Sequence, residues 1–479
     1  MAEREIELKL ELTGGEESLA RHPLLAGIDP AEAAQSSTYF DTKAGLVRRA
    51  GFSLRVRQSG DRFVQTVKAS AGAAGLFDRA EWEAAVGGST PDRAALGATP
   101  LGAILDGKAK ALRPAATIAA TRRRWDLRSG DDRIEIIHDA GEAVAGAAHE
   151  AFSEVELELK AGAPDALFAI GRELAEALEA RIGVLTKAER GQRLAEGRSG
   201  RAAKAEPVLL RPKASVAEGF AAVAHACLRH YRLNEPLVVR HDPAALHQAR
   251  VALRRLRSAL TLFRPALIDG AYAELREALR WLTGLFGDAR NLDVLIARIG
   301  DEAPDARAQL EAQRVAAYER LVAALRTPRA RLLPLDLLAW VEIGAWRQRK
   351  KAGRSLADFA SDRLDRRWRK VKNGAAGLAG ADDEARHDFR IEIKKLRYAV
   401  EFLASLFADA GRTKKLKAFR AALERLQEEL GDLNDAATGA IMLAEAGLEP
   451  RVEATAPAEL VARVERRARR LARQEPFWR

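Results

Sequence analysis

The sequence predicts an α+β N-terminal part, an eight-stranded antiparallel β barrel, followed by an all-α C-terminal part of duplicated helical bundles. Three observations lead to this prediction. Charged and apolar residues alternate with a period of two through about the first 190 residues, as in strands with one buried face. Beyond residue 207 the apolar residues recur with the period of a helix. In that second part, one basic motif occurs twice, 140 residues apart.

The charge of the chain is divided unevenly between the two parts. Residues 1–200 hold 27 Lys and Arg against 31 Asp and Glu, whereas residues 201–479 hold 52 against 37. The second part is therefore expected to attract polyanions. A single cysteine, Cys227, excludes a disulfide framework and fits a reducing compartment. The start of the chain has no apolar signal core and no apolar run approaches about 18 residues, so we expect a cytoplasmic protein with no membrane partner.

The elements of the N-terminal part follow from its patterns in order. In the first strand, residues 5–12, charged residues alternate with Ile and Leu, so one face can pack on a core. Seven further strands are expected at 35–40, 53–58, 62–68, 78–86, 115–127, 133–138 and 154–160, antiparallel because their connections are short. Between them we expect a short helix or loop at 16–26 and helices at 89–112 and 164–180.

The charged faces of these strands indicate a closed barrel with a charged lumen. Acids and bases stand two residues apart on six strands, whereas an exposed sheet face more often mixes Thr, Ser and Gln with its charges. Such a lumen suits a strongly anionic ligand with a bound metal, because Arg and Lys bind phosphate oxygens and glutamate pairs bind Mg²⁺ or Mn²⁺. The sequence contains no evident Walker-type loop, Ser-His-Asp arrangement or zinc-ligand spacing.

Six motifs of this part resemble those of the CYTH domain of the triphosphate tunnel metalloenzymes, over about residues 1–195. They are Glu5-x-Glu7-x-Lys9, Tyr39-Phe40-Asp41-Thr42, Leu54-Arg55-x-Arg57, Arg79-x-Glu81-x-Glu83, Glu154-x-Glu156-x-Glu158 and Lys187-Ala188-Glu189-Arg190-Gly191. The resemblance implies an eight-stranded tunnel that hydrolyses a triphosphate with a divalent metal.

The resemblance also implies roles for particular residues. The metal ligands would be Glu5, Glu7, Glu156 and Glu158. These four residues and Lys9 would be the catalytic residues. The phosphate-binding residues would be Lys9, Arg55, Arg57, Lys68, Arg79, Arg122, Arg124, Lys187 and Arg190.

Three points stay open at this stage. The run Arg122-Arg123-Arg124 leaves the facing of its strand ambiguous by one residue, which inverts the side. Asp139 is either a ligand or a turn residue before Ala140 and Gly141. Either a lumen carboxylate or the metal could orient the attacking water.

The C-terminal part is expected to hold about ten helices. We place a tunnel domain at 1–199, a linker at 200–213 and a helical domain at 214–479, with internal repeats at about 214–330 and 355–479. At about 100° per residue, each copy of the basic motif forms one stripe on a helix. The stripes are His247, Arg250, Arg254 and Arg257 in the first copy and His387, Arg390, Lys394 and Arg397 in the second. A further matching segment follows each stripe, at 287–293 and 431–435.

Matched spacing in two copies favours ligand binding over a solvated helix face. The repeat resembles the CHAD domain, a histidine-containing helical domain whose family is implicated in binding inorganic polyphosphate, over about residues 210–479. The resemblance implies that the two stripes bind polyphosphate. Lys394 and Lys395 replace the Arg254 and Arg255 of the first copy, so we do not expect equal affinities. The six cations of residues 463–473 either extend the basic surface or form an exposed helix face, and the second interpretation is favoured.

Together these features predict a metal-dependent inorganic triphosphatase, which converts tripolyphosphate to diphosphate and phosphate and binds inorganic polyphosphate through its helical part. The alternatives are a non-catalytic polyphosphate-binding or scaffold protein, and a tunnel enzyme acting on thiamine triphosphate or ATP. The glutamate pairs favour an enzyme, because a pure binder needs cations but no metal ligands. Nucleic-acid binding ranks last, because few aromatic residues lie near the stripes. All the named tunnel residues precede Gly200, so the barrel is expected to be active alone.

Overall fold

The structure, a computed structural model, describes residues 3–14, 16–69, 74–105, 107–299, 304–408, 412–445 and 458–479, and only the backbone of Glu3, Glu16, Glu17, Arg298 and 434–445. The chain forms two compact units. The first holds residues up to Ala203 together with Arg232–Leu237 and Leu325–Ile343. The second holds Lys204–Tyr231, Val238–Ala324 and Gly344–Arg479. Within the described ranges, no helix combines the length and the apolar character that a membrane span requires.

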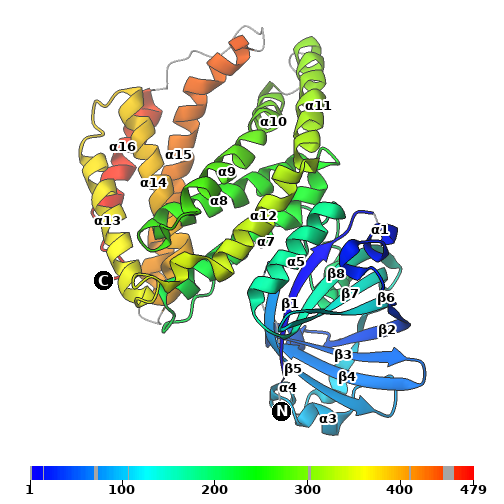
Figure 1. Cartoon of the computed structure of the whole chain (residues 1–479). Coiled ribbons are helices and arrows are strands. Elements are labelled where there is room, and N and C mark those ends of the chain that lie inside the picture. Colours follow the sequence, from blue (N-terminus) through cyan, green and yellow to red (C-terminus); the bar gives the residue numbers. More distant parts are fainter. Residues whose placement is uncertain are drawn as a thin grey trace. The chain divides into compact units, whose positions relative to one another are not determined.

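Eight antiparallel strands form the barrel of the first unit, which confirms the predicted fold (Figure 1). They lie in the order β5-β4-β3-β2-β6-β7-β8-β1, and β1 closes the barrel because it pairs with both β8 and β5. A two-residue strand, β9 (Arg181–Ile182), pairs with the end of β1. The eight strands are β1 (Glu3–Glu11), β2 (Ala31–Thr42), β3 (Phe52–Ser59), β4 (Arg62–Ala69), β5 (Leu76–Val86), β6 (Leu112–Ser129), β7 (Asp132–Ala145) and β8 (Ala148–Ala161).

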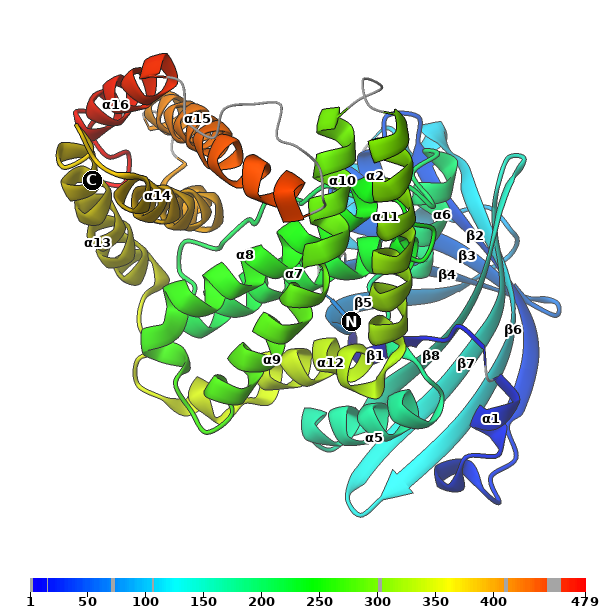
Figure 2. The ribbon, with the colours of Figure 1, turned by 90° about the horizontal axis from the view of Figure 1, so that it is seen from above.

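Strands β6, β7 and β8 are longer than the alternation predicts and curve strongly around the lumen (Figure 2). Asp139, Ala140 and Gly141 lie inside β7, so Asp139 does not begin a turn. Glycine is required at 141 because β6 passes close by: a Cβ atom there would lie 2.0 Å from the carbonyl oxygen of Ala119. The glycine that reads as a turn signal in the sequence is therefore a site of close strand packing.

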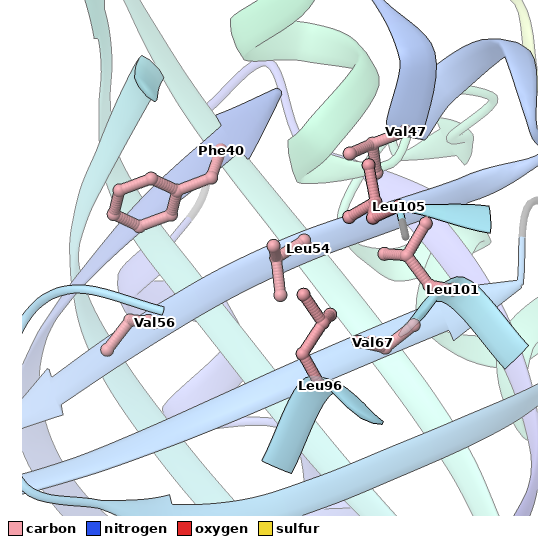
Figure 3. Packing of buried hydrophobic residues seen from close by; sticks show 8 residues of the cluster. All are labelled: Phe40, Val47, Leu54, Val56, Val67, Leu96, Leu101 and Leu105. Carbon is pink, nitrogen blue, oxygen red and sulfur yellow. The ribbon is translucent and has the colours of Figure 1, made fainter. Parts of the chain in front are cut away.

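Short helices cover the outer face of β2, β3 and β4. Leu54, Val56 and Val67 from the strands pack with residues of α2 (Leu46–Arg49), α3 (Arg93–Gly97) and α4 (Pro100–Ile104) (Figure 3). The single helix predicted at 89–112 is thus wrong: α3, α4 and a 3₁₀ turn, η2 (Ala109–Ala111), take its place. The proline at the start of α4 holds Thr99 in an extended conformation, which interrupts the helix.

Three further helices contact the barrel. Helix α5 (Pro164–Ala177) packs outside β1 and β8, and α12 (Pro328–Ile343), which belongs to the same unit, packs on α5 and β9. Helix α6 (Lys187–Ala195) begins at a capping box in which Thr186 and Glu189 each accept a hydrogen bond from the other's backbone N–H. This cap fixes the start of α6 and so places Lys187 at the barrel lumen. Near the N-terminus lie α1 (Glu16–Ala20) and η1 (Pro23–Leu25), where a short helix or loop is expected.

The second unit is helical and duplicated, as predicted. Counting α12, ten α-helices follow residue 215 in the described residues. In the second unit these are α7 (Val216–Val238, which extends into the first unit), α8 (Pro243–Leu267), α9 (Tyr272–Leu285), α10 (Gly287–Ile299), α11 (Pro304–Arg326), α13 (Leu356–Ala376), α14 (Asp383–Leu403), α15 (Thr413–Glu445) and α16 (Ala458–Ala472).

The two copies meet at equivalent residues. Ser215, just before α7, pairs antiparallel with Ser355, just before α13 and 140 residues later. The N–H of Val216 donates to the carbonyl of Arg354 at 2.9 Å, and the N–H of Leu356 donates to that of Ala214 at 3.0 Å. Antiparallel pairing of equivalent positions is what an approximate two-fold axis between two repeats produces. The stripe helices α8 and α14 also contact one another.

Candidate functional site

A charged cavity of about 420 Å³ lies in the barrel. Seven carboxylates and nine Lys and Arg side chains line it, because alternate residues of the strands face inward. Twelve of the thirteen barrel residues predicted from the sequence are among them: Glu5, Glu7, Lys9, Arg55, Arg57, Lys68, Arg79, Arg122, Arg124, Glu156, Glu158 and Lys187. Arg190 is not. The sequence-based site set omits Glu81, Glu83, Glu135 and Lys160, which also line the cavity and share the same two-residue spacing.

One row of carboxylates crosses the wall formed by β7, β8 and β1. Glu158 lies directly opposite Glu7 on β1 and opposite Glu135 on β7. Burial raises the pKa of Glu7, and the carboxylates of Glu156 and Glu5 add to the rise. Burial likewise raises the pKa of Glu158, with Glu5 and Glu135 adding to it. Like charges opposite one another are destabilising, so this row has negative charge that a cation would neutralise.

Glu5 lies beside this row and is held ionised. Burial alone would raise its pKa, but Lys68 and Arg79 outweigh burial and lower it to about 2. Lys68 Nζ lies 2.7 Å from both Glu5 oxygens, and Arg79 bridges Glu5 and Glu7 at 3.0 and 2.8 Å. Carboxylate oxygens are the ligands that Mg²⁺ and Mn²⁺ prefer. Glu5, Glu7, Glu135 and Glu158 therefore fit a divalent metal by donor type, and in this structure Lys68, Arg79 and Lys160 pair with them.

A tighter carboxylate cluster lies deeper, but two lysines already neutralise it. Oxygens of Asp139, Glu154 and Glu156 lie within 4.8 Å of one another, the one such group of three found among the described residues. Lys187 Nζ contacts all three, at 2.8, 2.5 and 2.8 Å. Lys9 Nζ lies 3.0 Å from Glu154 and 2.7 Å from Glu156. Burial would lower the pKa of Lys187, yet the three carboxylates raise it well above its usual value.

Arginines of β3 and β6 line another part of the cavity wall. The structure resolves the facing of β6: Arg122 and Arg124 line the cavity, whereas Arg123 points outward to Glu32 at 2.8 Å. Register decides this, because Arg122 lies opposite Asp139 and donates two hydrogen bonds to it, at 2.8 and 2.6 Å. Asp139 thus binds an arginine and a lysine of the site.

Two arginines of β3 have hydrogen-bond donors that are not used. The Nε atoms of Arg55 and Arg57 are buried without a hydrogen-bond partner among the described residues. The nearest carboxylate, Glu83, lies 3.8 Å from Arg55 and 3.1 Å from Arg57. The charge of Arg55, with burial and Arg122 adding to it, lowers the pKa of Arg57 to about 10. This part of the wall has an excess of positive charge and donors in position for an anion.

Arg190 occupies a second layer behind the cavity. It lies one turn after Lys187 on α6 and donates to Glu150 at 2.8 Å and to Glu11 at 3.1 Å. Its guanidinium lies 5.3 Å from the centre of the Phe152 ring. Arg190 therefore holds the carboxylates behind the site and does not line the cavity.

In the second unit, the predicted stripe of α8 is part of a larger cluster of cations. Burial lowers the pKa of His247, and Arg290 of α10, Arg254 and Arg250 lower it further. The pKa of Arg250 and that of Arg257 are lowered in the same way, by burial first and then by neighbouring arginines. Around His247 and Arg250, the neighbouring charges that shift these pKa values are all those of arginines. The surface has a surplus of positive charge.

The two stripes partly converge on one pocket of about 330 Å³. The sequence assigns one stripe to each bundle, but Arg254 and Arg257 of α8 line the same pocket as Lys394 of α14. Arg276, Arg367 and Lys395, which are outside the predicted set, line it as well. His247, Arg250, His387, Arg390 and Arg397 are not among its lining residues.

The two segments that follow the stripes contain acidic residues, and one of these residues contacts helix α11. Asp293 of the first segment binds Arg314 at 2.8 Å and the hydroxyl of Tyr318 at 2.9 Å, so it anchors α11. In the second segment, the side chains of Asn434 and Asp435 lie outside the part of the chain that the structure describes.

Comparisons with known proteins match both parts of the chain. The CYTH domain family matches residues 3–191, and the CHAD domain family matches residues 222–444. The crystal structure of a CHAD domain from the plant Ricinus communis is similar at 32% identity, over 56% of this chain and 90% of that one, with a TM-score of 0.46. A putative adenylyl cyclase from Hippeastrum, described as having a dominant triphosphatase activity, is similar at 17% identity, over 41% and 96%, with a TM-score of 0.31. PptA from Streptomyces chartreusis is similar at 19% identity, over 54% and 95%, with a TM-score of 0.35.

Proposed function

The chain joins a CYTH domain to a CHAD domain and belongs to both families, and on this basis we propose that its barrel hydrolyses inorganic triphosphate with Mg²⁺ or Mn²⁺. One observation carries the proposal: carboxylates of β1, β7 and β8 lie side by side in the cavity wall, and the buried Nε atoms of Arg55 and Arg57 on β3 have no hydrogen-bond partner among the described residues. A triphosphate with a bound cation presents both kinds of charge. Phosphoryl transfer needs mainly positioning and charge neutralisation from the protein, which this arrangement supplies.

The chain's residues divide into two roles. Arg55, Arg57, Arg122 and Arg124 bind phosphate oxygens, together with Lys9, Lys68, Arg79 and Lys187 on the margins of the carboxylate wall. Glu5, Glu7 and Glu158, joined by Glu135, would hold the metal, which would polarise phosphate oxygens and offset their charge. Glu156, a ligand by family resemblance, binds Lys9 and Lys187 in this structure, so it would be available to the metal only if those ammonium groups turned to phosphate. A water attacks a terminal phosphorus, the bond from that phosphorus to the bridging oxygen breaks, and diphosphate leaves with that oxygen while the attacked group becomes phosphate.

The composition of the cavity favours an inorganic substrate. Tyr39 is the one aromatic residue among its described lining residues, and Ile137 and Ala188 are the apolar ones. An adenine or thiazolium ring gains most of its affinity from apolar and stacking contacts, which a wall of charged side chains does not provide. The ring of an organic triphosphate would therefore find few apolar or stacking contacts in this cavity.

Phosphate release by the full chain tests the proposal. Tripolyphosphate, thiamine triphosphate and ATP are assayed side by side with Mg²⁺, with Mn²⁺ and with EDTA. We expect metal-dependent hydrolysis of tripolyphosphate well above that of the two organic substrates. Equal rates in EDTA would contradict metal dependence, and faster hydrolysis of an organic substrate would contradict inorganic specificity. A chain that hydrolyses none of the three would be the non-catalytic polyphosphate-binding protein.

We also propose that the second unit binds inorganic polyphosphate through the cations of α8 and α14. The mutual repulsion around His247, Arg250 and Arg257 supports this proposal, since a polyanion would relieve it. Clustered lysine and arginine side chains suit a long flexible polyanion better than they suit a nucleic acid, whose bases need stacking partners. Cys227 is buried and unpaired, which fits the cytoplasmic location that we propose from the sequence.

A further inference from the structure

A buried chain of ion pairs extends from the cavity to a residue far along the sequence. Arg232, which belongs to the first unit with residues 232–237, is 3% exposed. Its guanidinium donates to Glu11 at 2.9 Å, to Glu235, and through Nε to the backbone carbonyl of Ile182 at 3.0 Å. Glu235 in turn accepts a hydrogen bond from Arg181 at 3.1 Å. All the guanidinium nitrogens of Arg232 are therefore engaged, and two of them, Nε and Nη2, donate to residues of β9 and β1 where these strands pair.

The same chain continues inward to the lumen. Glu11 uses its other oxygen to bind Arg190 at 3.1 Å. Arg190 lies 3.9 Å from Glu154, whose Oε2 atom has no hydrogen-bond partner among the described residues. Glu154, which is fully buried, holds the ammonium groups of Lys9 and Lys187, and both of these line the cavity. Charges alternate at every step from Arg232 to the two lysines.

We propose that Arg232 is a positioning residue of the barrel site, acting through Glu11, Arg190 and Glu154 on Lys9 and Lys187. The inference rests on the proposed function, because it assigns the two lysines to triphosphate binding. Without Arg232, Glu11 loses one of its two arginines and draws Arg190 toward itself. Glu154 then loses its more distant partner and holds the lysine ammonium groups more tightly, away from the cavity. Glu235 is left with Arg181 alone.

The barrel unit therefore extends beyond residues 1–199, the range expected from the sequence, to include Arg232. Residues 1–199 contain every cavity residue named above, but the ion-pair chain is complete only with Arg232, which lies within the CHAD match. No pattern in the sequence indicates this, because Arg232 stands in a helix whose other residues have an ordinary helical pattern. Mutation of a residue that orients the ligands of a metal site typically costs about 10- to 100-fold in metal affinity or activity, and we take this as the scale of the effect for Arg232.

Arg331 provides a matched control. It too is a buried arginine of the first unit from a late segment of the chain, 5% exposed. Its donors go to the backbone carbonyls of Ala175, Glu176 and Ala180, and no ion pair among the described residues leads from it to the cavity. If Arg232 has a purely structural role, its replacement should therefore change KM no more than replacement of Arg331 does.

The test uses the full chain with Arg232→Gln, Arg232→Lys, Glu11→Gln, the double variant Arg232→Gln/Glu11→Gln, and Arg331→Gln. Rates are corrected for the folded fraction, taken from thermal unfolding followed by circular dichroism. We expect Arg232→Gln to raise KM for tripolyphosphate by about 10- to 100-fold with a smaller change in kcat. Arg232→Lys should recover part of the loss, because it restores a charge beside Glu11 but not the fork. The double variant should be no worse than the poorer single variant, since both break one chain.

Three outcomes would overturn the inference: an Arg232→Gln KM equal to that of Arg331→Gln, no recovery in Arg232→Lys, or additive losses in the double variant. Calorimetric binding of tripolyphosphate in EDTA separates the inference from the proposed function. If the wild type binds tripolyphosphate in EDTA but does not hydrolyse it when Mg²⁺ or Mn²⁺ is added, the proposed function fails, and a matching loss of affinity in Arg232→Gln still supports the inference. A wild type that neither binds nor hydrolyses tripolyphosphate overturns both.

Discussion

The ammonium nitrogen of Lys187 lies 2.8 Å from a carboxylate oxygen of Asp139, inside the barrel. Lys187 is the first residue of helix α6, and Asp139 lies in the middle of strand β7. The same ammonium group binds Glu154 and Glu156, so one lysine from a helix contacts three acids from two strands. This cluster is where the stability of the barrel and the electrostatics of its site are coupled.

Lys187→Met should destabilise the barrel strongly near neutral pH. Removing one partner of a buried ion cluster leaves carboxylates uncompensated, which costs about 3–5 kcal/mol in free energy of unfolding. Lys160→Met is the control, because the half-buried Lys160 pairs with Glu158 nearer the solvent and should cost only about 1 kcal/mol or less. Urea unfolding of the two variants and the wild type measures the difference. Equal stabilities would show that the cluster contributes nothing.

The Lys187→Met effect should shrink as the pH falls. Burial opposes ionisation of Glu156 and Asp139, but their cationic partners, Lys187 first, lower both pKa values in the folded state. A lowered folded pKa contributes stability that is full above the unfolded value of about 4 and is lost below it. The difference between wild type and variant should therefore be constant from pH 7 to 5 and decline from about pH 4 downward. A difference independent of pH would contradict this origin.

Glu7→Gln should abolish metal-dependent hydrolysis and keep the fold. Glu7 belongs to the carboxylate row and faces Glu158, so an amide there removes a charged donor without changing volume. We expect at least about 100-fold loss in rate, as for loss of one ligand of a Lewis-acidic metal. Glu32→Gln is the matched control on the outer face of β2, where Glu32 pairs with Arg123. Full activity of Glu7→Gln in a phosphate-release assay would exclude the proposed metal wall.

A chain ending at Ala203 should be less stable than the full chain, contrary to the expectation from sequence alone. It lacks Arg232, Glu235 and helix α12, all of which belong to the barrel unit. Helix α12 buries Leu338 where β5 begins, against Gly75. Each large apolar side chain that this truncation removes from the core or exposes to water costs about 1.5–3 kcal/mol of stability. Thermal unfolding and size-exclusion chromatography measure the effect; an unchanged melting temperature and a monomeric, active fragment would contradict it.

Arg254→Ala/Arg257→Ala should weaken binding of long-chain polyphosphate and leave tripolyphosphate hydrolysis unchanged. Both arginines line the pocket shared by α8 and α14, and removal of each charge-assisted hydrogen bond to phosphate should cost about 1.5–3 kcal/mol. Arg466→Ala/Arg470→Ala on the exposed face of α16 removes the same charge and is the control. Calorimetry at two salt concentrations should show a shallower salt dependence for the pocket variant alone. Equal losses in both variants would indicate a diffuse electrostatic surface.

His247 should make polyphosphate binding depend on pH. Because its pKa is lowered, this dependence should appear at a lower pH than the usual pKa of histidine would give. Burial and the charges of Arg290, Arg254 and Arg250 lower its pKa in the free protein, so it is neutral at pH 6.5 and above. A bound polyanion favours the protonated form, and affinity should therefore rise as the pH falls below about 6.5 and stay level between 8 and 7. His247→Gln should remove this rise. A wild-type affinity that changes mainly between pH 8 and 7 would contradict the assignment.

Much of the fold was predictable because its signals are local. The two-residue alternation in β1, with Glu5, Glu7 and Lys9 on one face, is a property of neighbouring residues, and strand geometry turns it directly into a lumen wall. The duplicated stripe on α8 and α14 is equally local. The prediction of one helix at 89–112 was wrong at Thr99, where a following proline excluded the helical conformation.

The sequence alone determined where the eight barrel strands lie, which face of most of them is charged, and that the helical part is a repeat; the facing of β6 and the full length of β6, β7 and β8 needed the structure. Only the tertiary structure decided which of those charges meet. Glu7, Glu158 and Glu135 form a row because of register between strands far apart in the chain, and Lys187 reaches Asp139 because a capping box fixes the start of α6. Arg232 reaches Glu11 across a still longer separation. Coulomb interactions depend on distance in space, so the charge balance of the site was set by partners that no local pattern identifies.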